Sequence, residues 1–134
     1  MNEYPFTSLV TLALVLLGVL LAKRVSTARL DFSQSDQPSV TQHSVEIYSD
    51  PKFMIAFRNQ MNLLEHLILF MPTLWIFAVG VSDGLAAIVG LGYFIGRLLY
   101  ARSYPQSHRV GFMLAWVSML VLMIGAVASS IYQL

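Results

Sequence analysis

Three polar residues stand beside a stretch of the chain that is apolar enough to cross a membrane. Arg58, Asn62 and Glu65 are followed directly by the apolar run 67–81. At about 100° per residue they fall at roughly 0°, 40° and 340° around a helix, so they share one narrow face. Such side chains cost roughly 2.5–3.5 kcal/mol each at membrane depth and are usually functional there. The spacing predicts half of a polar site within a helix bundle.

The same face also has a purely structural interpretation. Arg58 and Glu65 could form an ion pair, with Asn62 as a hydrogen-bonding residue between helices. Gln60 lies at roughly 200°, facing away from Arg58, where it would serve a neighbouring subunit or contact lipid headgroups. His66, at roughly 80°, flanks the polar face, where a lone histidine is more often a hydrogen-bonding partner than a metal ligand. The spacing leaves structure and ligand binding equally open.

A second polar face is expected further along the chain. Arg97, Tyr100 and Tyr104 fall at roughly 0°, 300° and 340° if one helix continues through all three. Tyrosine and snorkelling arginine are also common at membrane interfaces. These residues therefore predict either an interfacial belt or a cationic and phenolic binding surface.

The residue types narrow the chemistry of such a site. The chain has no cysteine, which excludes disulfides, thiolate metal sites and a protein thiol nucleophile. The histidines His43, His66 and His108 do not have metal-ligand spacing, and no metal is expected. Arginines clamp carboxylates bidentately, and Glu65 could hold an ammonium group. A ligand with carboxylates and an amine, such as a small acidic peptide, fits this set, and any reacting sulfur must come from the ligand.

The composition indicates an all-α integral membrane protein. Of 134 residues, 57% are hydrophobic and 11% are charged, and the mean hydropathy is +0.68. Ordinary soluble proteins have roughly 25% charged residues. The net charge is +1 and no basic tract is present, so no nucleic-acid partner is expected. The length suits one domain over residues 1–134 with four spans.

The apolar runs place these spans at about 6–29, 52–81, 85–102 and 110–132, with a polar cytoplasmic loop at about 31–51. The first run ends in Lys23 and Arg24 without an Ala-x-Ala site, so we expect a retained helix and not a signal peptide. Asp50 followed by Pro51 is typical of a helix start. Together these elements predict a four-transmembrane-helix bundle.

All eight basic residues fall at the end of this bundle that holds the first and third connections. The positive-inside rule then places those connections in the cytoplasm and both termini outside it. Five arginines from or near four helices could instead converge on an anionic ligand: Arg29, Arg58, Arg97, Arg102 and Arg109. Arg109 would open the last helix, where a cation opposes the macrodipole, so topology or a bound anion must explain it.

Three segments resemble, in the right order, the membrane-associated proteins in eicosanoid and glutathione metabolism, the MAPEG family. The pattern Arg58-x-Gln60-x-Asn62-x-x-Glu65 resembles the second-helix signature of that family. The pattern Arg97-x-x-Tyr100-x-x-x-Tyr104, followed by Arg109, is similar to its second block, and 25–29 looks like its first-helix exit. The resemblance covers nearly the whole chain.

This resemblance implies a homotrimer of four-helix subunits, with glutathione bound as co-substrate between adjacent subunits near the cytoplasmic side. Arg29 and Gln60 would come from the neighbouring subunit. Arg109 would match the arginine that stabilises the glutathione thiolate, since a nearby guanidinium raises the thiolate fraction of a thiol. The residues implied to line the tripeptide site within one subunit are Arg58, Asn62, Glu65, His66, Arg97, Tyr100 and Tyr104.

The sequence departs from the leukotriene-synthesising branch of this family. Leu30 follows Arg29 where that branch has a second arginine, His66 replaces a tyrosine, and the spacing from Tyr104 to Arg109 is shorter. We therefore assign no leukotriene or prostaglandin synthesis. A bacterial-type member, in the bacterial inner membrane, fits these departures better.

Two functions follow as expectations. The first is a membrane-bound glutathione transferase, or glutathione peroxidase, that acts on lipophilic small-molecule electrophiles. Membrane lipid is expected as a further partner. The alternative is a non-enzymatic protein of the same fold that binds a small anion or lipid or acts as a structural subunit.

Overall fold

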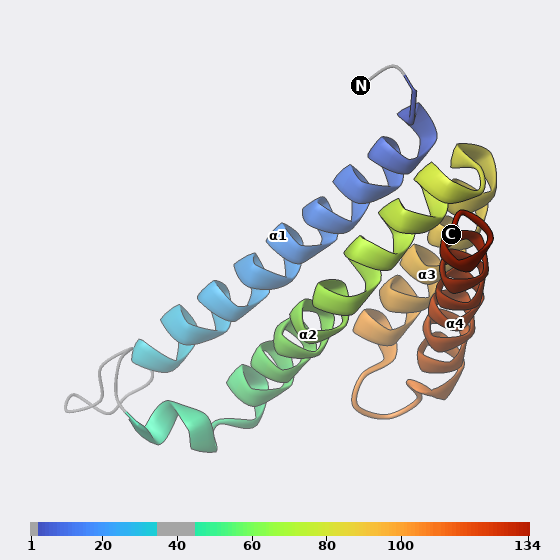
Figure 1. The fold of residues 1–134 in the computed structure, drawn as a ribbon. Coiled ribbons are helices and arrows are strands. Elements are labelled where there is room, and N and C mark those ends of the chain that lie inside the picture. The colour runs from blue at the N-terminus through green and yellow to red at the C-terminus, as the bar shows by residue number, and fades with distance from the viewer. Residues whose placement is uncertain (1–2, 35–44) are drawn as a thin grey trace.

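A computed structural model describes residues 3–34 and 45–134 of the chain (Figure 1). The elements are α1 (Pro5–Ser33), the short 3-10 helix η1 (Val45–Ser49), α2 (Pro51–Gly80), α3 (Asp83–Ser103) and α4 (Arg109–Tyr132). Residues 35–44 of the polar loop expected at 31–51 lie outside the described residues; on either side of them, α1 extends to Ser33 and η1 precedes α2.

The four α-helices are each long and apolar enough to cross a membrane. Many of their large apolar side chains, such as Leu16, Ile68, Ile88 and Ile124, are exposed on the outside of the single chain. An exposed apolar surface of this extent suits contact with lipid or with neighbouring copies. The fold is therefore that of an all-helical integral membrane protein.

The helices form an antiparallel bundle in which α1 packs on α2 and α3, and α4 packs on α3 and α2. The start of α1, the end of α4 and the turn between α2 and α3 lie at one end of the bundle (Figure 1). The end of α1, the start of α2 and the α3–α4 connection lie at the other end. This second end carries the arginine-rich segments of the sequence.

Local signals in the sequence fix where α2 and α3 begin. The Asp50 side chain accepts a hydrogen bond from the backbone N–H of Phe53 at 2.9 Å, and Pro51 is the first residue of α2. Asp83 opens α3 and reaches across to α1, where its carboxylate accepts from the backbone N–H groups of Phe6 (3.1 Å) and Thr7 (2.8 Å). A carboxylate at a helix N-terminus is favourable, so Asp83 ties two helices together.

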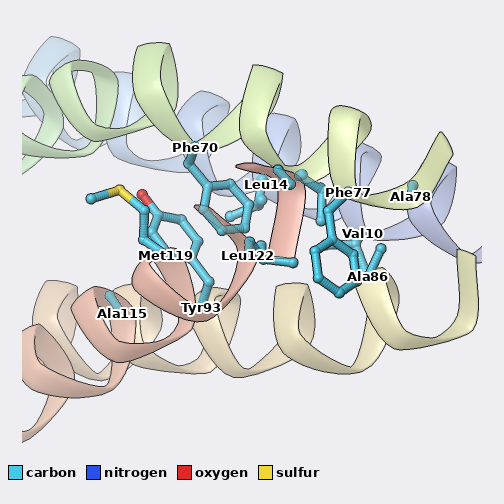
Figure 2. Close-up of a cluster of buried hydrophobic side chains, with 12 residues drawn as sticks. Val10, Leu14, Phe70, Phe77, Ala78, Ala86, Tyr93, Ala115, Met119 and Leu122 are labelled. Atoms are coloured by element: carbon cyan, nitrogen blue, oxygen red, sulfur yellow. The ribbon is translucent and has the colours of Figure 1, made fainter. Parts of the chain in front are cut away.

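The central core lies between α2 and α3. The rings of Phe70 and Tyr93 stack with their centroids 3.6 Å apart, and both side chains are fully buried (Figure 2). Leu14 from α1 and Leu122 from α4 complete this layer, so all four helices contribute to it. The Tyr93 hydroxyl is buried there and forms no hydrogen bond with the part of the chain that the structure describes.

A close backbone-to-backbone contact joins α3 to α4 near the arginine-rich end. A Cβ added at Gly96 would lie 2.7 Å from the backbone nitrogen of Ala115, and one at Gly111 would lie 2.5 Å from that of Tyr100. Small residues allow such close backbone approach in membranes, where packing replaces the hydrophobic effect. This contact fixes the end of α3, which carries Tyr100, against the start of α4.

Candidate functional site

A cleft of about 350 Å³ opens where the first half of α2 meets the end of α3. Five of its six lining side chains are polar or charged, which distinguishes it from an ordinary lipid-facing groove. The lining residues are Arg58, Met61, Asn62, Glu65, Tyr100 and Tyr104. The cleft thus combines residues from both of the polar faces that the sequence indicates.

The α2 side of the cleft presents two charges of opposite sign. Arg58 and Glu65 are exposed to the cleft, and Asn62 between them is half-buried. They are separated by seven residues, or roughly 10.5 Å along a helix. Within the described parts of the chain they form no ion pair, so the structural pairing considered from the sequence is not made. The Asn62 Oδ1 atom is buried, and no group in residues 3–34 or 45–134 donates a hydrogen bond to it.

The α3 side of the cleft is phenolic. The helix ends at Ser103, and Tyr104 is its C-cap residue, with an extended backbone. The predicted helical face therefore stops one residue short of Tyr104. Its ring nevertheless stacks on that of Tyr100, with centroids 5.4 Å apart and an interplanar angle of 25°. Two phenols consequently form one wall.

Arg97 does not line the cleft but lies beneath it. Its side chain is only 2% exposed, and its guanidinium carbon lies 4.9 Å from the centroid of the Tyr100 ring. Its Nε and Nη1 atoms are buried and have no hydrogen-bond partner among the described residues. A buried charge without a partner is costly, so this guanidinium makes the floor of the cleft strongly favourable for an anion.

His66 lies at the side of the polar face, as its place on the helix wheel indicates. It is half-buried, and its ring lies edge-on to Trp116 at 5.6 Å and to Phe112 at 6.5 Å. Within one chain it faces these α4 aromatic rings and does not line the cleft.

Three more of the expected site residues stand apart from the cleft in the single chain. Arg29 is half-buried with its guanidinium 5.5 Å from the centroid of the Phe53 ring. Gln60 is half-buried and does not line the cleft. Arg109 is the first residue of α4, is exposed, and does not line it either. The single chain therefore assembles only part of the predicted residue set.

Two residues near the cleft were not predicted as parts of the site. Asn59 is 4% exposed, and its Nδ2 donates to the Ala101 carbonyl at 2.9 Å, which ties α2 to α3. His108 packs against Tyr100 and Tyr104, with ring centroids 5.4 and 5.8 Å away. No pattern in the sequence predicts the contact of His108 with the two tyrosines, because that contact depends on the path of the α3–α4 connection.

The residues at the cleft suit an anion that also carries a positive group. Guanidinium and phenol groups bind carboxylates, and the carboxylate of Glu65 can bind an ammonium group. The part of the chain that the structure describes contains no cluster of three His, Cys, Asp or Glu side chains fit to hold a metal ion. Asn62 lines the cleft and can hydrogen-bond a polar ligand, whereas the buried Arg97 guanidinium can act on an anion in the cleft only through its charge.

The fold and the cleft together define a class: a four-helix integral membrane protein with a charged and phenolic cleft at one end. The sequence model of the MAPEG family matches residues 7–128. The chain belongs to the MAPEG family.

Individual relatives agree with this membership. An uncharacterized protein of Synechocystis is 33% identical over 99% of this chain and 93% of its own length. The leukotriene C4 synthase of Mus musculus is 35% identical over 79% of this chain and 65% of the enzyme. That of Rattus norvegicus is 35% identical over 81% of this chain and 69% of the enzyme.

Proposed function

We propose that this protein is a membrane-bound glutathione transferase that conjugates lipophilic electrophiles from the bilayer. One observation carries the proposal: the cleft holds opposite charges that do not pair with each other, beside a buried guanidinium that has no counter-ion among the residues that the structure describes. A buried guanidinium is expensive to leave unpartnered, and the exposed charges of Arg58 and Glu65 are free to bind a ligand that bears both charges. Membership of the MAPEG family supports glutathione as that ligand.

Each polar or charged residue that lines the cleft has a counterpart on glutathione, which carries two carboxylates, an amine, two peptide bonds and a thiol. We assign Arg58 to a carboxylate, Glu65 to the ammonium group and Asn62 to a peptide amide. The hydroxyls of Tyr100 and Tyr104 donate hydrogen bonds to the bound peptide. Arg97 contributes its positive charge from beneath, and His66 flanks the site.

The remaining predicted residues require neighbouring copies. We propose a homotrimer in which Arg29 and Gln60 of one subunit complete the cleft of the next. Both are half-buried outside the cleft of their own chain, which supports this division. The basic end of the bundle is assigned to the cytoplasmic side of a bacterial inner membrane, with both termini on the other side.

The proposed chemistry is nucleophilic substitution by sulfur. The glutathione thiol loses its proton to water, and Arg109 stabilises the resulting thiolate electrostatically. The thiolate forms a carbon–sulfur bond to the electrophile while the leaving group departs with its electron pair. Holding both reactants in one cleft supplies proximity. Reduction of lipid hydroperoxides by two glutathione molecules is a second activity of the same thiolate.

Conjugation of glutathione to chlorodinitrobenzene, by the purified protein in detergent or lipid, tests this proposal. We expect saturable turnover with glutathione, and a glutathione KM that rises roughly tenfold or more when Arg58 is replaced by Ala. Turnover no faster than the uncatalysed reaction, for this and other aromatic, epoxide and hydroperoxide substrates, would contradict it.

One observation favours the non-enzymatic alternative. Arg109, the residue assigned to the thiolate, is exposed and does not line the cleft of the single chain. A protein that binds glutathione tightly but accelerates none of these reactions would be a binding subunit of the same fold.

A further inference from the structure

His108 lies behind the phenolic wall of the cleft, on the connection that leads from α3 into α4. It is half-buried and is the N-cap residue of α4. Its ring lies edge-on to Tyr100, at 5.4 Å and 73°, and tilted against Tyr104, at 5.8 Å and 58°. It does not line the cleft itself, but both of these tyrosines do.

A single hydrogen bond fixes the orientation of this imidazole. The Nδ1 atom of His108 lies 3.1 Å from the carbonyl oxygen of Pro105. A carbonyl oxygen can only accept, so Nδ1 carries the hydrogen and donates it. This bond selects the ring's tautomer and holds its plane relative to the connection.

The side chains of Tyr100 and Tyr104, in contrast, are held by contacts of their rings and not by hydrogen bonds of their hydroxyls. Within the described residues, neither phenol hydroxyl has a hydrogen bond to another protein group. Tyr100 is packed between the Arg97 guanidinium, at 4.9 Å, and the Tyr104 ring, at 5.4 Å. His108 contacts both rings and is the member of this group whose ring is tied to the backbone of the α3–α4 connection.

We propose that His108 is a positioning residue that holds the Tyr100–Tyr104 pair so that both hydroxyls face the bound glutathione. The inference rests on the proposed function, because it assigns those hydroxyls to the ligand. Its physical basis is pre-organisation: a ligand group binds more tightly when the protein does not lose side-chain freedom on binding. The role needs both the anchored N–H and the ring.

Two matched variants test the Nδ1–H donor and the ring of His108 separately. His108→Asn keeps an N–H donor at the position of Nδ1 but removes the ring. His108→Phe keeps a ring of similar size but cannot donate to Pro105. We expect each variant to raise the KM for glutathione roughly three- to tenfold, with kcat changed less than about twofold. The thermal midpoint without glutathione, and the oligomeric state, establish that each variant is folded.

The decisive measurement repeats both substitutions in a protein whose two phenols are replaced, Tyr100→Phe with Tyr104→Phe. If His108 acts through the hydroxyls, its substitution changes the glutathione KM there by less than about 1.5-fold, because the interaction is already gone. If glutathione does not saturate the doubly substituted protein, Tyr104→Phe alone serves as the background. There, the His108 substitutions should change the glutathione KM less than they do in the wild type.

Each other result overturns the inference. Equal effects in both backgrounds would mean that His108 acts independently of the phenols, as a helix cap alone would. A fall in kcat at constant KM would assign His108 to the chemical step. If the wild type binds glutathione and the His108 variants have the same glutathione KM as the wild type, His108 has no positioning role and the proposed function stands. If the wild type does not bind glutathione, both the positioning role and the proposed function are wrong.

Discussion

The guanidinium of Arg97 lies 4.9 Å from the centre of the Tyr100 ring, so a buried cation supports a phenol that lines the cleft. Cation–π contacts stabilise by up to about 2 kcal/mol when desolvated, which offsets only part of the cost of an unpartnered buried charge. The free protein therefore keeps an unfavourable group beneath its cleft. A bound anion would relieve that cost.

Replacing Arg97 should consequently weaken glutathione binding without lowering the thermal midpoint of the ligand-free protein. We expect Arg97→Met to leave the thermal midpoint without glutathione unchanged or higher, because apolar replacement of a buried charge is often neutral or stabilising. The same variant should bind glutathione roughly tenfold more weakly. Calorimetric titration and thermal unfolding of one preparation measure both quantities. A large loss of stability in the ligand-free variant would mean that Arg97 has a structural partner instead.

Arg58 should carry direct binding energy, because it is exposed in the cleft and has no protein counter-ion there. We expect Arg58→Ala to raise the Kd for glutathione roughly tenfold or more, since a charge-assisted bidentate bond is lost. Arg102→Ala is the matched control, because Arg102 is exposed on α3 but does not line the cleft. Unchanged affinity of an intact Arg58→Ala protein would remove Arg58 from the site.

Arg109 should matter for turnover more than for binding. We expect Arg109→Ala to lower kcat roughly tenfold or more while the Kd for glutathione changes little, because its assigned partner is the thiolate that forms during reaction. The ultraviolet absorbance of the bound thiolate gives an independent reading of the same effect. Equal kcat in the variant and the wild type would exclude Arg109 from the mechanism.

The contact between Gly96 and Gly111 should be intolerant of any side chain. At Gly111 an added Cβ would lie 2.5 Å from the Tyr100 backbone nitrogen, so α3 and α4 would have to move apart. We expect Gly111→Ala to lower the thermal midpoint and to weaken glutathione binding, since Tyr100 is displaced. Gly18→Ala is the control, because a Cβ at Gly18 meets no atom within 4 Å. Equal midpoints for the two variants would contradict the close contact.

The parts of the site that were predictable from sequence are the local ones. Arg58, Asn62 and Glu65 share a helix face because their spacing within one helix fixes their angles. The capping role of Asp50 is confirmed, since it too depends only on neighbouring residues. The four-helix arrangement follows from apolar runs long enough to span a bilayer.

The parts that were missed depend on contacts between elements. Helical angles place Tyr104 near Tyr100 only if the helix continues, whereas here a C-cap residue keeps the two rings stacked. The wheel angles also do not reveal that Arg97 is buried under Tyr100 and not exposed in the cleft. His108 reaches both tyrosines through a non-helical connection, for which no periodic pattern exists.

The central claim is that the cleft binds glutathione through its charged groups, and the thermal midpoint as a function of glutathione concentration tests it most directly. A ligand that binds only the folded state raises the midpoint by mass action. We predict a saturable rise with glutathione and none with glutathione diethyl ester, which keeps the sulfur but lacks both carboxylates. No shift up to several millimolar glutathione in an intact oligomer, or an equal shift with the ester, would contradict the claim.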